Sequence, residues 1–244
     1  KEDRWISAID FQPGNATVVD RASFRIEINK TRGVCSDNVE TIGNWVPGQS
    51  AVRLPQGTGR LLPAGSSIVM QIRYRKNGEA VTDRSRLALY FAKESVGKIV
   101  RNVTINPAAA PVPANTENQR VKASMTLTDP TEAVAIRPLL FPFAKSIEAT
   151  AFRPDGSVEV LIVAKGYRYD WQPTYQFKKP VALPKGTRIE VTAYLDNSDN
   201  NRNNPNDPPI ALQFAEPLCE IALTQEAQLK SASNLRGGRK GETR

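Results

Sequence analysis

Short runs of alternating apolar and polar residues, closed by turns that contain Gly or Pro, recur along the whole chain. Residues 22–28 and 189–193 alternate in this way, which is the pattern of half-buried antiparallel strands. Long amphipathic helical patterns are missing. The sequence therefore predicts an all-β protein, and its 244 residues are enough for two tandem antiparallel β-sandwich domains of the jelly-roll type.

Two turn pairs that contain Gly predict hairpins. They are Asn77-Gly78, between residues 68–74 and 86–91, and Asp155-Gly156, between residues 147–152 and 158–163. A weak internal echo also relates the two halves of the chain. Leu62-Pro63-Ala64-Gly65 leads into one apolar strand pattern, and Leu183-Pro184-Lys185-Gly186 leads into another.

The clearest boundary is the Pro-rich segment around residues 106–115, because proline blocks the hydrogen bonds of a strand ladder and favours an extended linker. We therefore expect an N-terminal sandwich over residues 1–105 and a linker over 106–118. A C-terminal sandwich follows over 119–232, and a flexible basic tail over 233–244.

The chain contains no histidine, which removes the commonest general base and the commonest ligand for copper and zinc. A standard serine or cysteine triad is therefore excluded. We find no GxSxG elbow, no P-loop and no GxGxxG motif. The sequence predicts no catalytic residue, no metal and no cofactor, and hence a protein that is not an enzyme.

The two cysteines, Cys35 and Cys219, lie far apart and do not form a CxxC-type metal site. Either they form one disulfide that joins the two halves, as in an oxidising compartment, or they are two buried free thiols. The sequence leaves both possibilities open.

The formal net charge of +8 is spread over strands and turns rather than gathered into a groove. This distribution argues against nucleic acid as a partner. The one local cluster is the Gly-rich tail with Arg236, Arg239 and Lys240, which is either a solvated end or a docking segment.

No apolar run reaches the ~20 residues of a membrane helix, so we expect no transmembrane segment. An export signal or lipid anchor removed before Lys1 stays possible.

Several segments together resemble the bacterial copper type II ascorbate-dependent monooxygenase-like proteins, relatives of peptidylglycine α-hydroxylating monooxygenase and dopamine β-monooxygenase. The matching stretches are 5–19, 43–48, 59–74, 77–78, 81–92, 145–156, 169–175 and 183–198. The resemblance implies two β-sandwich domains with a solvent-filled cleft between them and one copper on each domain.

The ligand positions of that family are replaced here. The resemblance places a His-His pair on Asp20 and Arg21 and a third His on Arg73. It places a His-X-His pair on Leu139 and Phe141, with Leu140 between them, and a Met near Ala222. Leucine, phenylalanine and alanine donate no lone pair, and arginine is a permanent cation, so copper is not expected. Arg21 and Arg73 are instead expected to pair with Asp20.

The run Leu139 to Phe143 becomes apolar through these changes. It is predicted to be a filled core strand, with a docking surface through Leu140 and Phe143 as the alternative. Two other segments allow either a purely structural or a functional interpretation. The Asn/Asp-rich loop 196–207 is read as a surface loop rather than a calcium site. The aromatic residues between 167 and 177 are read as core packing rather than a binding platform.

The resemblance and the lost ligands together predict a non-catalytic structural or docking subunit of an assembly that is periplasmic or otherwise extracytoplasmic. The implied partner is a c-type cytochrome or a membrane-bound electron-transfer complex of respiration or photosynthesis, with peripheral membrane association through that partner. One alternative is a ligand-binding protein that uses the cleft between the domains. Another is a monooxygenase-like enzyme with altered chemistry.

Overall fold

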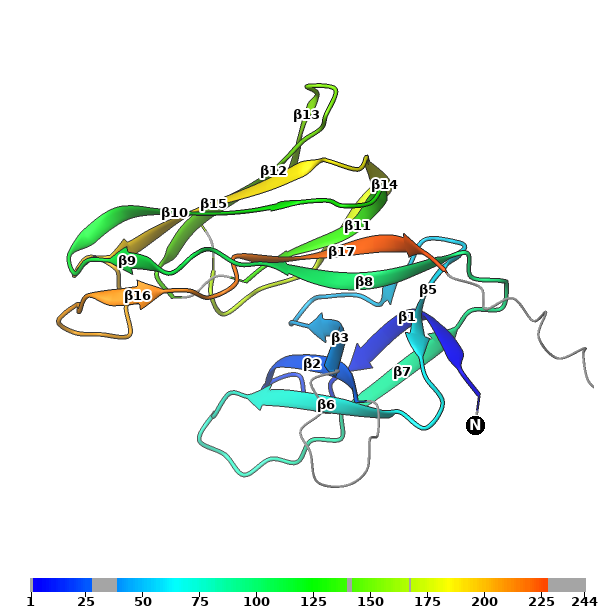
Figure 1. The fold of residues 1–244 in the computed structure, drawn as a ribbon. Coiled ribbons are helices and arrows are strands. Elements are labelled where there is room, and N and C mark those ends of the chain that lie inside the picture. Colours follow the sequence, from blue (N-terminus) through cyan, green and yellow to red (C-terminus); the bar gives the residue numbers. More distant parts are fainter. Residues whose placement is uncertain (1, 28–38, 140–141, 167, 228–244) are drawn as a thin grey trace, which may run out of the picture.

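The computed structural model describes residues 2–27, 39–139, 142–166 and 168–227, which form seventeen strands in four sheets (Figure 1). This confirms the predicted all-β class. Within the described ranges, no helix is long and apolar enough to cross a membrane.

The largest sheet has eight strands and runs through both halves of the molecule. Its order is β14 (Tyr175–Leu183), β11 (Thr131–Pro138), β17 (Cys219–Glu226), β8 (Lys98–Ile105), β5 (Thr58–Leu62), β1 (Arg4–Gln12) and β4 (Val52–Arg53), with β7 (Arg86–Phe91) also paired to β1. The halves join where β5 pairs with β8, in parallel, through Thr58 and Gly59.

The first sandwich forms where a three-stranded sheet packs against the β1 end of the large sheet. Its strands are β3 (Val39–Trp45), β2 (Val19–Glu27) and β6 (Ser67–Tyr74), in that order. Phe11 of β1 contacts Phe24 of β2 and Trp45 of β3, with ring centroids 5.4 and 5.1 Å apart. These buried rings fill the space between the sheets.

The second sandwich forms over the other end of the large sheet, as Figure 1 shows above β17 and β8. Its second sheet has the order β10 (Thr116–Thr126), β15 (Arg188–Asn197), β12 (Ala144–Phe152) and β13 (Val158–Lys165). Alternate residues of β15, including Ile189, Val191 and Leu195, are fully buried against this core. A small sheet of β9 (Ala110–Val112) and β16 (Leu212–Phe214) completes the fold.

The Pro-rich segment is not an extended linker but part of the second sandwich. Residues 110–112 form β9, which pairs with β16, and β10 begins at Thr116. β8 ends just before the predicted boundary, yet it pairs along its whole length with β17. The reason is packing, because Ile105 of β8 lies in the core of the second sandwich.

One of the two predicted hairpins is confirmed and the other is wrong. β12 and β13 pair across Asp155-Gly156, where Gly156 has a φ of 84°. β6 and β7, on either side of Asn77-Gly78, belong to different sheets. The segment that joins them, residues 75–85, is long enough to cross between the sheets, whereas a two-residue turn forces neighbouring strands to pair.

The two Pro-Gly turns of the internal echo have the same structural role. Each connects a strand of the large sheet to a strand of the sheet that covers it, β5 to β6 in one half and β14 to β15 in the other. Ser66 donates to the Pro63 carbonyl at 3.1 Å, and Thr187 donates to the Pro184 carbonyl at 3.0 Å. The echo therefore marks equivalent arches in the two sandwiches.

Candidate functional site

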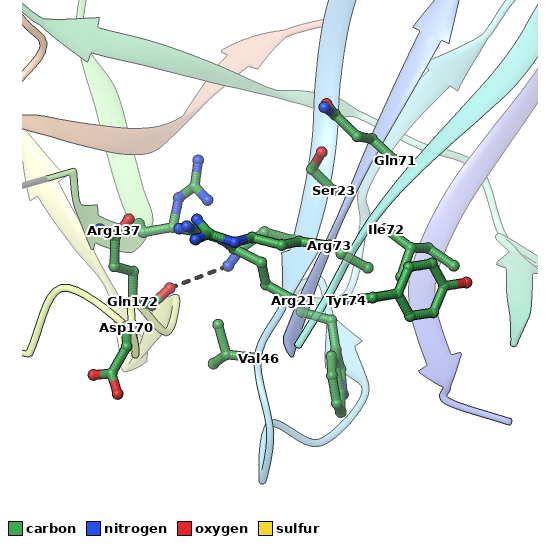
Figure 2. Close-up of a pocket in the computed structure, with 13 residues that line it drawn as sticks. Arg21, Ser23, Val46, Gln71, Ile72, Arg73, Tyr74, Arg137, Asp170 and Gln172 are labelled. Atoms are coloured by element: carbon green, nitrogen blue, oxygen red, sulfur yellow. Dashed lines mark hydrogen bonds between the residues drawn. The ribbon is translucent and has the colours of Figure 1, made fainter. Parts of the chain in front are cut away.

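A cleft of about 600 Å³ lies between the two sandwiches and is the candidate site. Figure 2 shows Arg21 and Arg73 extending from one side toward Arg137, Gln172 and Asp170 on the other. We call it the arginine cleft. It is lined by Arg21, Ala22, Ser23, Asn44, Trp45, Val46, Gln71, Ile72, Arg73, Tyr74, Arg137, Asp170 and Gln172.

A β-bulge positions the charged residues of the first wall. Val19 of β2 lies opposite Tyr74 of β6, but Arg21 lies opposite Arg73, so Asp20 is the extra residue. A bulge redirects side chains, and here it places Asp20 beside both arginines. The Asp20 carboxylate is 4.0 Å from the Arg21 Nε and 3.7 Å from the Arg73 Nε.

Asp20 makes its shortest contact with a third cation. The guanidinium of Arg75 donates to the Asp20 carboxylate at 2.8 Å. Three arginines therefore share one carboxylate that is only 10% exposed. Because each guanidinium has five N–H donors, the cluster keeps an excess of positive charge and of donors.

Tyr169 adds a phenol to this cluster. The Arg21 guanidinium lies 5.5 Å from the centroid of its ring. Hydrogen bonds from Arg21, and then from Arg73, hold the pKa of the Tyr169 hydroxyl below its ordinary value, because both favour the phenolate. The same positive field would favour any other oxyanion placed there.

The second wall carries Arg137, at the end of β11. Its guanidinium lies 3.5 Å from the Glu220 carboxylate, and its side chain is 16% exposed. Its Nε atom is buried and has no hydrogen-bond partner. A buried donor left unpaired costs free energy. The Nη groups of Arg137 are the part of this side chain that can reach an acceptor in the cleft.

A buried polar network contacts Glu220, the carboxylate that pairs with Arg137. Glu220 accepts a hydrogen bond from Asn102 at 3.0 Å, and Asn102 accepts one from Arg60 at 2.6 Å. Arg60 is 6% exposed and lies 3.8 Å from Glu40. Burial raises the pKa of the Glu40 carboxyl, and burial also lowers the pKa of Arg60, which is the direction expected for charges removed from water.

Hydrogen bonds between the halves hold the walls in place. Asn44 of β3 donates to the Gln172 carbonyl at 3.2 Å and accepts a hydrogen bond from Thr174. The Trp171 indole donates to the Pro47 carbonyl at 3.0 Å. Strands from one half and the segment before β14 from the other are therefore fixed relative to each other.

The resemblance predicted two former copper sites. The structure brings together the residues predicted for the first site but separates Leu139 from Ala222, which were predicted for the second. Asp20, Arg21 and Arg73 converge, and the expected ion pairs between them are present. Ala222 lies opposite Ala135, while the Leu139 amide donates to the Leu218 carbonyl, four residues away along the strand. Leu139 and Ala222 are thus separated by roughly 13 Å along the ladder.

The alternative of a docking surface does not hold at Phe143, since this side chain is 7% exposed and packs in the second core. This agrees with the core interpretation of the apolar run. Leu140 and Phe141 fall outside the described residues. The tail residues Arg236, Arg239 and Lys240 also lie beyond them.

Of the two cysteines, the structure describes Cys219 alone, as a fully buried free thiol in β17. Burial raises the pKa of this thiol to about 12. Cys35 lies in a stretch that is not described.

The polar side chains of the loop 196–207 bond to one another and to neighbouring segments of the second sandwich. Asp196 accepts hydrogen bonds from Ser198 and lies 3.1 Å from Lys145. Asn201 and Asn204 bond to the backbone or to Asn197. Within the described ranges, no group of three Cys, Asp or Glu side chains is placed to hold a metal ion.

The aromatic residues between 167 and 177 do not all pack in a core. Trp171 and Tyr175 are each 42% exposed, while Phe177 packs partly against the second core. Tyr167 is not described. The turn before β14 breaks the strand alternation on which the core interpretation depended.

Sequence reasoning did not single out Arg137, Asn44, Gln71 or Gln172 as site residues. A signal existed for some of them, because residues 43–48 and 169–175 carry the family resemblance on either side of the expected cleft. Arg137 gave no such signal, since it is one polar residue at the end of an apolar strand.

Comparisons with known proteins identify no family. No family model matches the chain, and no curated protein sequence matches it. Solved structures with a similar architecture include viral capsid proteins. The major capsid protein P2 of bacteriophage PM2 has a TM-score of 0.38 at 9% identity, covering 95% of this chain and 91% of that one.

The VP2 subviral particle of infectious bursal disease virus has a TM-score of 0.28 at 10% identity. That match covers 92% of this chain and 58% of the VP2 chain, so the chain spans less than two thirds of the VP2 length. These likenesses concern the β-sandwich architecture alone.

Proposed function

We propose that the protein is a non-catalytic binding protein that holds a small ligand in the arginine cleft. The observation that carries this proposal is the cleft itself, about 600 Å³ of space lined by polar side chains from both sandwiches. Ligand pockets are commonly of this size and commonly lie between domains. The Arg73 side chain is 56% exposed, so the cleft is accessible from solvent.

The described residues of the apolar run, Leu139, Pro142 and Phe143, do not line the cleft. Phe143 packs in the second core, and Leu139 is not among the lining residues. The lining instead combines guanidinium and amide groups with the apolar surfaces of Val46 and Ile72. A few placed polar groups on an apolar surface are typical of a ligand pocket.

The cleft is also pre-formed. The bonds from Asn44 to Gln172 and from Trp171 to Pro47 tie the two walls together before any ligand arrives. A pre-formed site avoids the cost of ordering its walls on binding, which favours affinity.

The proposed relationship to the copper monooxygenase family is compatible with this function. The three positions that correspond to one copper site, Asp20, Arg21 and Arg73, come together at the cleft. In this account the old metal site has become part of a binding surface.

Native mass spectrometry of the protein isolated from its source tests the proposal. The variant Ser23→Trp places a large side chain in the cleft, and Ser124→Trp, on exposed β10, is the matched control. We expect a small ligand to accompany the wild type and Ser124→Trp but not Ser23→Trp. Ligand retention by Ser23→Trp, or no ligand in any sample, contradicts the proposal.

A second candidate function, docking to a protein partner, is favoured by the valine edge, defined as Val158, Val160 and Val163 of β13. These side chains are 57%, 55% and 51% exposed. In the described part of the chain β13 pairs with β12 alone, at the end of its sheet. An exposed apolar edge strand can accept an extended segment of a partner as an added strand. The family resemblance suggests an extracytoplasmic partner that carries a cytochrome.

Affinity isolation from native membranes tests this second candidate. The triple variant V158T/V160T/V163T removes the apolar edge, and V81T changes another exposed valine as a control. Docking predicts a stoichiometric partner that is recovered with the wild type and V81T but lost with the triple variant. A solitary protein in all three samples rules docking out.

A further inference from the structure

We infer that the ligand of the arginine cleft carries an oxyanion, either a carboxylate or a phosphoryl group, bound between Arg21 and Arg73 on one wall and Arg137 on the other. This inference rests on the proposed function, since it names the ligand class of the same site. It is carried by a mismatch between hydrogen-bond donors and acceptors in the lining.

The first wall supplies donors that its own carboxylate does not use. Asp20 bonds to Arg75 at 2.8 Å, while its distances to Arg21 and Arg73 are 4.0 and 3.7 Å. Both contacts are longer than an ordinary hydrogen bond. Each guanidinium has five N–H groups, so Arg21 and Arg73 keep donors for a ligand beyond those that they direct at Asp20 and at the Tyr169 hydroxyl.

The second wall supplies another donor. The guanidinium of Arg137 borders the cleft, and the contact of its Nη2 atom to Glu220 is long at 3.5 Å. Glu220 also accepts a hydrogen bond from Asn102, so its charge is not directed at Arg137 alone. A guanidinium has five N–H donors, so Arg137 can donate to an oxygen atom in the cleft beside its contact to Glu220.

Three acceptor groups of the lining, by contrast, already accept hydrogen bonds. Asn44 Oδ1 accepts from Thr174, and Gln71 Oε1 accepts from Arg25 at 3.3 Å. The Asp170 carboxylate accepts two hydrogen bonds from Arg168, at 3.1 and 2.7 Å. A neutral polyol needs acceptors for its hydroxyl protons, whereas an oxyanion needs only donors. The lining is matched to the oxyanion.

Guanidinium groups suit this task for a geometric reason. Their planar N–H pairs match the two oxygens of a carboxylate or a phosphoryl group, and the charge shortens and strengthens the bonds. Val46 and Ile72 border the same space, so a short apolar portion next to the oxyanion would also be buried. This favours a small organic acid or phosphate ester.

Isothermal titration calorimetry with simple probes tests the inference. The probes are inorganic phosphate, succinate and neutral glycerol, at constant ionic strength set with sodium chloride. The variants are R21Q/R73Q and R137Q on the two walls. The control R120Q/R202Q removes two exposed arginines that do not line the cleft. Circular dichroism checks folding, and R73Q alone serves if the double variant is unfolded.

We expect succinate or phosphate, but not glycerol, to bind the wild type and the control. Binding of succinate alone identifies a carboxylate site, and binding of phosphate alone identifies a phosphoryl site. Each removed arginine should weaken binding by about tenfold or more, as for other hydrogen bonds to charged groups.

Two results overturn the inference. One is that neither anion binds at 50 mM, about the weakest affinity that such a site would have. The other is that anions bind equally well to R21Q/R73Q, which assigns them to a different surface. If a neutral ligand occupies the cleft in native mass spectrometry, the proposed function survives and only the oxyanion is lost. If no ligand of any kind is found there, both fail.

Discussion

At the scale of single residues, the most informative side chains are charged or reactive groups placed away from water. Arg60, Arg137 and Glu220 form a network between the two sandwiches, and Cys219 lies fully buried next to Glu220. Buried charge is costly unless it is paired, so these positions constrain the fold and invite direct tests.

Cys219 should resist alkylation in the folded protein. Burial raises the pKa of its thiol to about 12, so at pH 8 the reactive thiolate is almost absent. In a C35S background, iodoacetamide should label Cys219 only after unfolding, as read by mass spectrometry. Rapid labelling of the folded protein contradicts this prediction. In the wild-type protein, a disulfide between Cys35 and Cys219 would contradict the assignment of Cys219 as a free thiol.

Replacement of Arg60 by methionine should destabilise the protein. Methionine fills a similar volume but leaves Asn102 and Glu40 without the guanidinium that they contact. We expect a loss of about 3 kcal/mol in the free energy of unfolding, measured by urea denaturation. R86M, on an exposed position of β7, is the control and should change little. A loss below ~0.5 kcal/mol for R60M would show that the network is not stabilising.

At the scale of elements, local signals predicted strands better than they predicted partners. The alternation at residues 22–28 and 189–193 marked β2 and β15 because side-chain periodicity is a local property. The Asn77-Gly78 turn misled because it lies within an eleven-residue connection rather than a tight turn, and β6 and β7 belong to different sheets. Which strands become neighbours depends on long-range packing.

The pairing of the Pro-rich segment was also not predictable from local sequence. Prolines excluded it from the centre of a sheet, but they did not exclude a short paired strand such as β9. No local feature showed that Ile105 would pack with the second half.

Asp196, near the end of β15, should make stability depend on pH. Burial raises the pKa of Asp196, but hydrogen bonds from Ser198 and Lys145 outweigh it, so the pKa lies below its ordinary value. A carboxyl with a lowered folded-state pKa contributes stability above about pH 4 and loses it as the pH falls through the folded value.

D196N should therefore cost about 1–2 kcal/mol at pH 7. Its difference from the wild type should shrink below pH 4 in denaturation experiments at a series of pH values. D199N, on an exposed neighbour, is the control. A difference that does not change with pH would mean that the loss at Asp196 is not electrostatic.

At the scale of the whole molecule, the two sandwiches share one large sheet and enclose the arginine cleft. The sequence analysis named Asp20, Arg21 and Arg73 together, and these three side chains are neighbours in the structure. It did not reveal the opposite wall, because Arg137 reaches the cleft only through the pairing of β11 with β17 and the packing of the two halves. The wall with Arg21 and Arg73 was thus predictable from the sequence. The wall with Arg137 was not, because its position depends on how the strands pair and how the two sandwiches pack.

The most direct test of a binding cleft is to map backbone amide chemical shifts by NMR while the protein is titrated with a mixture of small metabolites. We predict changes around Ala22, Ser23, Asn44, Ile72 and Gln172, which line both walls of the arginine cleft. Ser23→Trp should abolish them. Changes confined to β13, or no changes at all, would contradict the account.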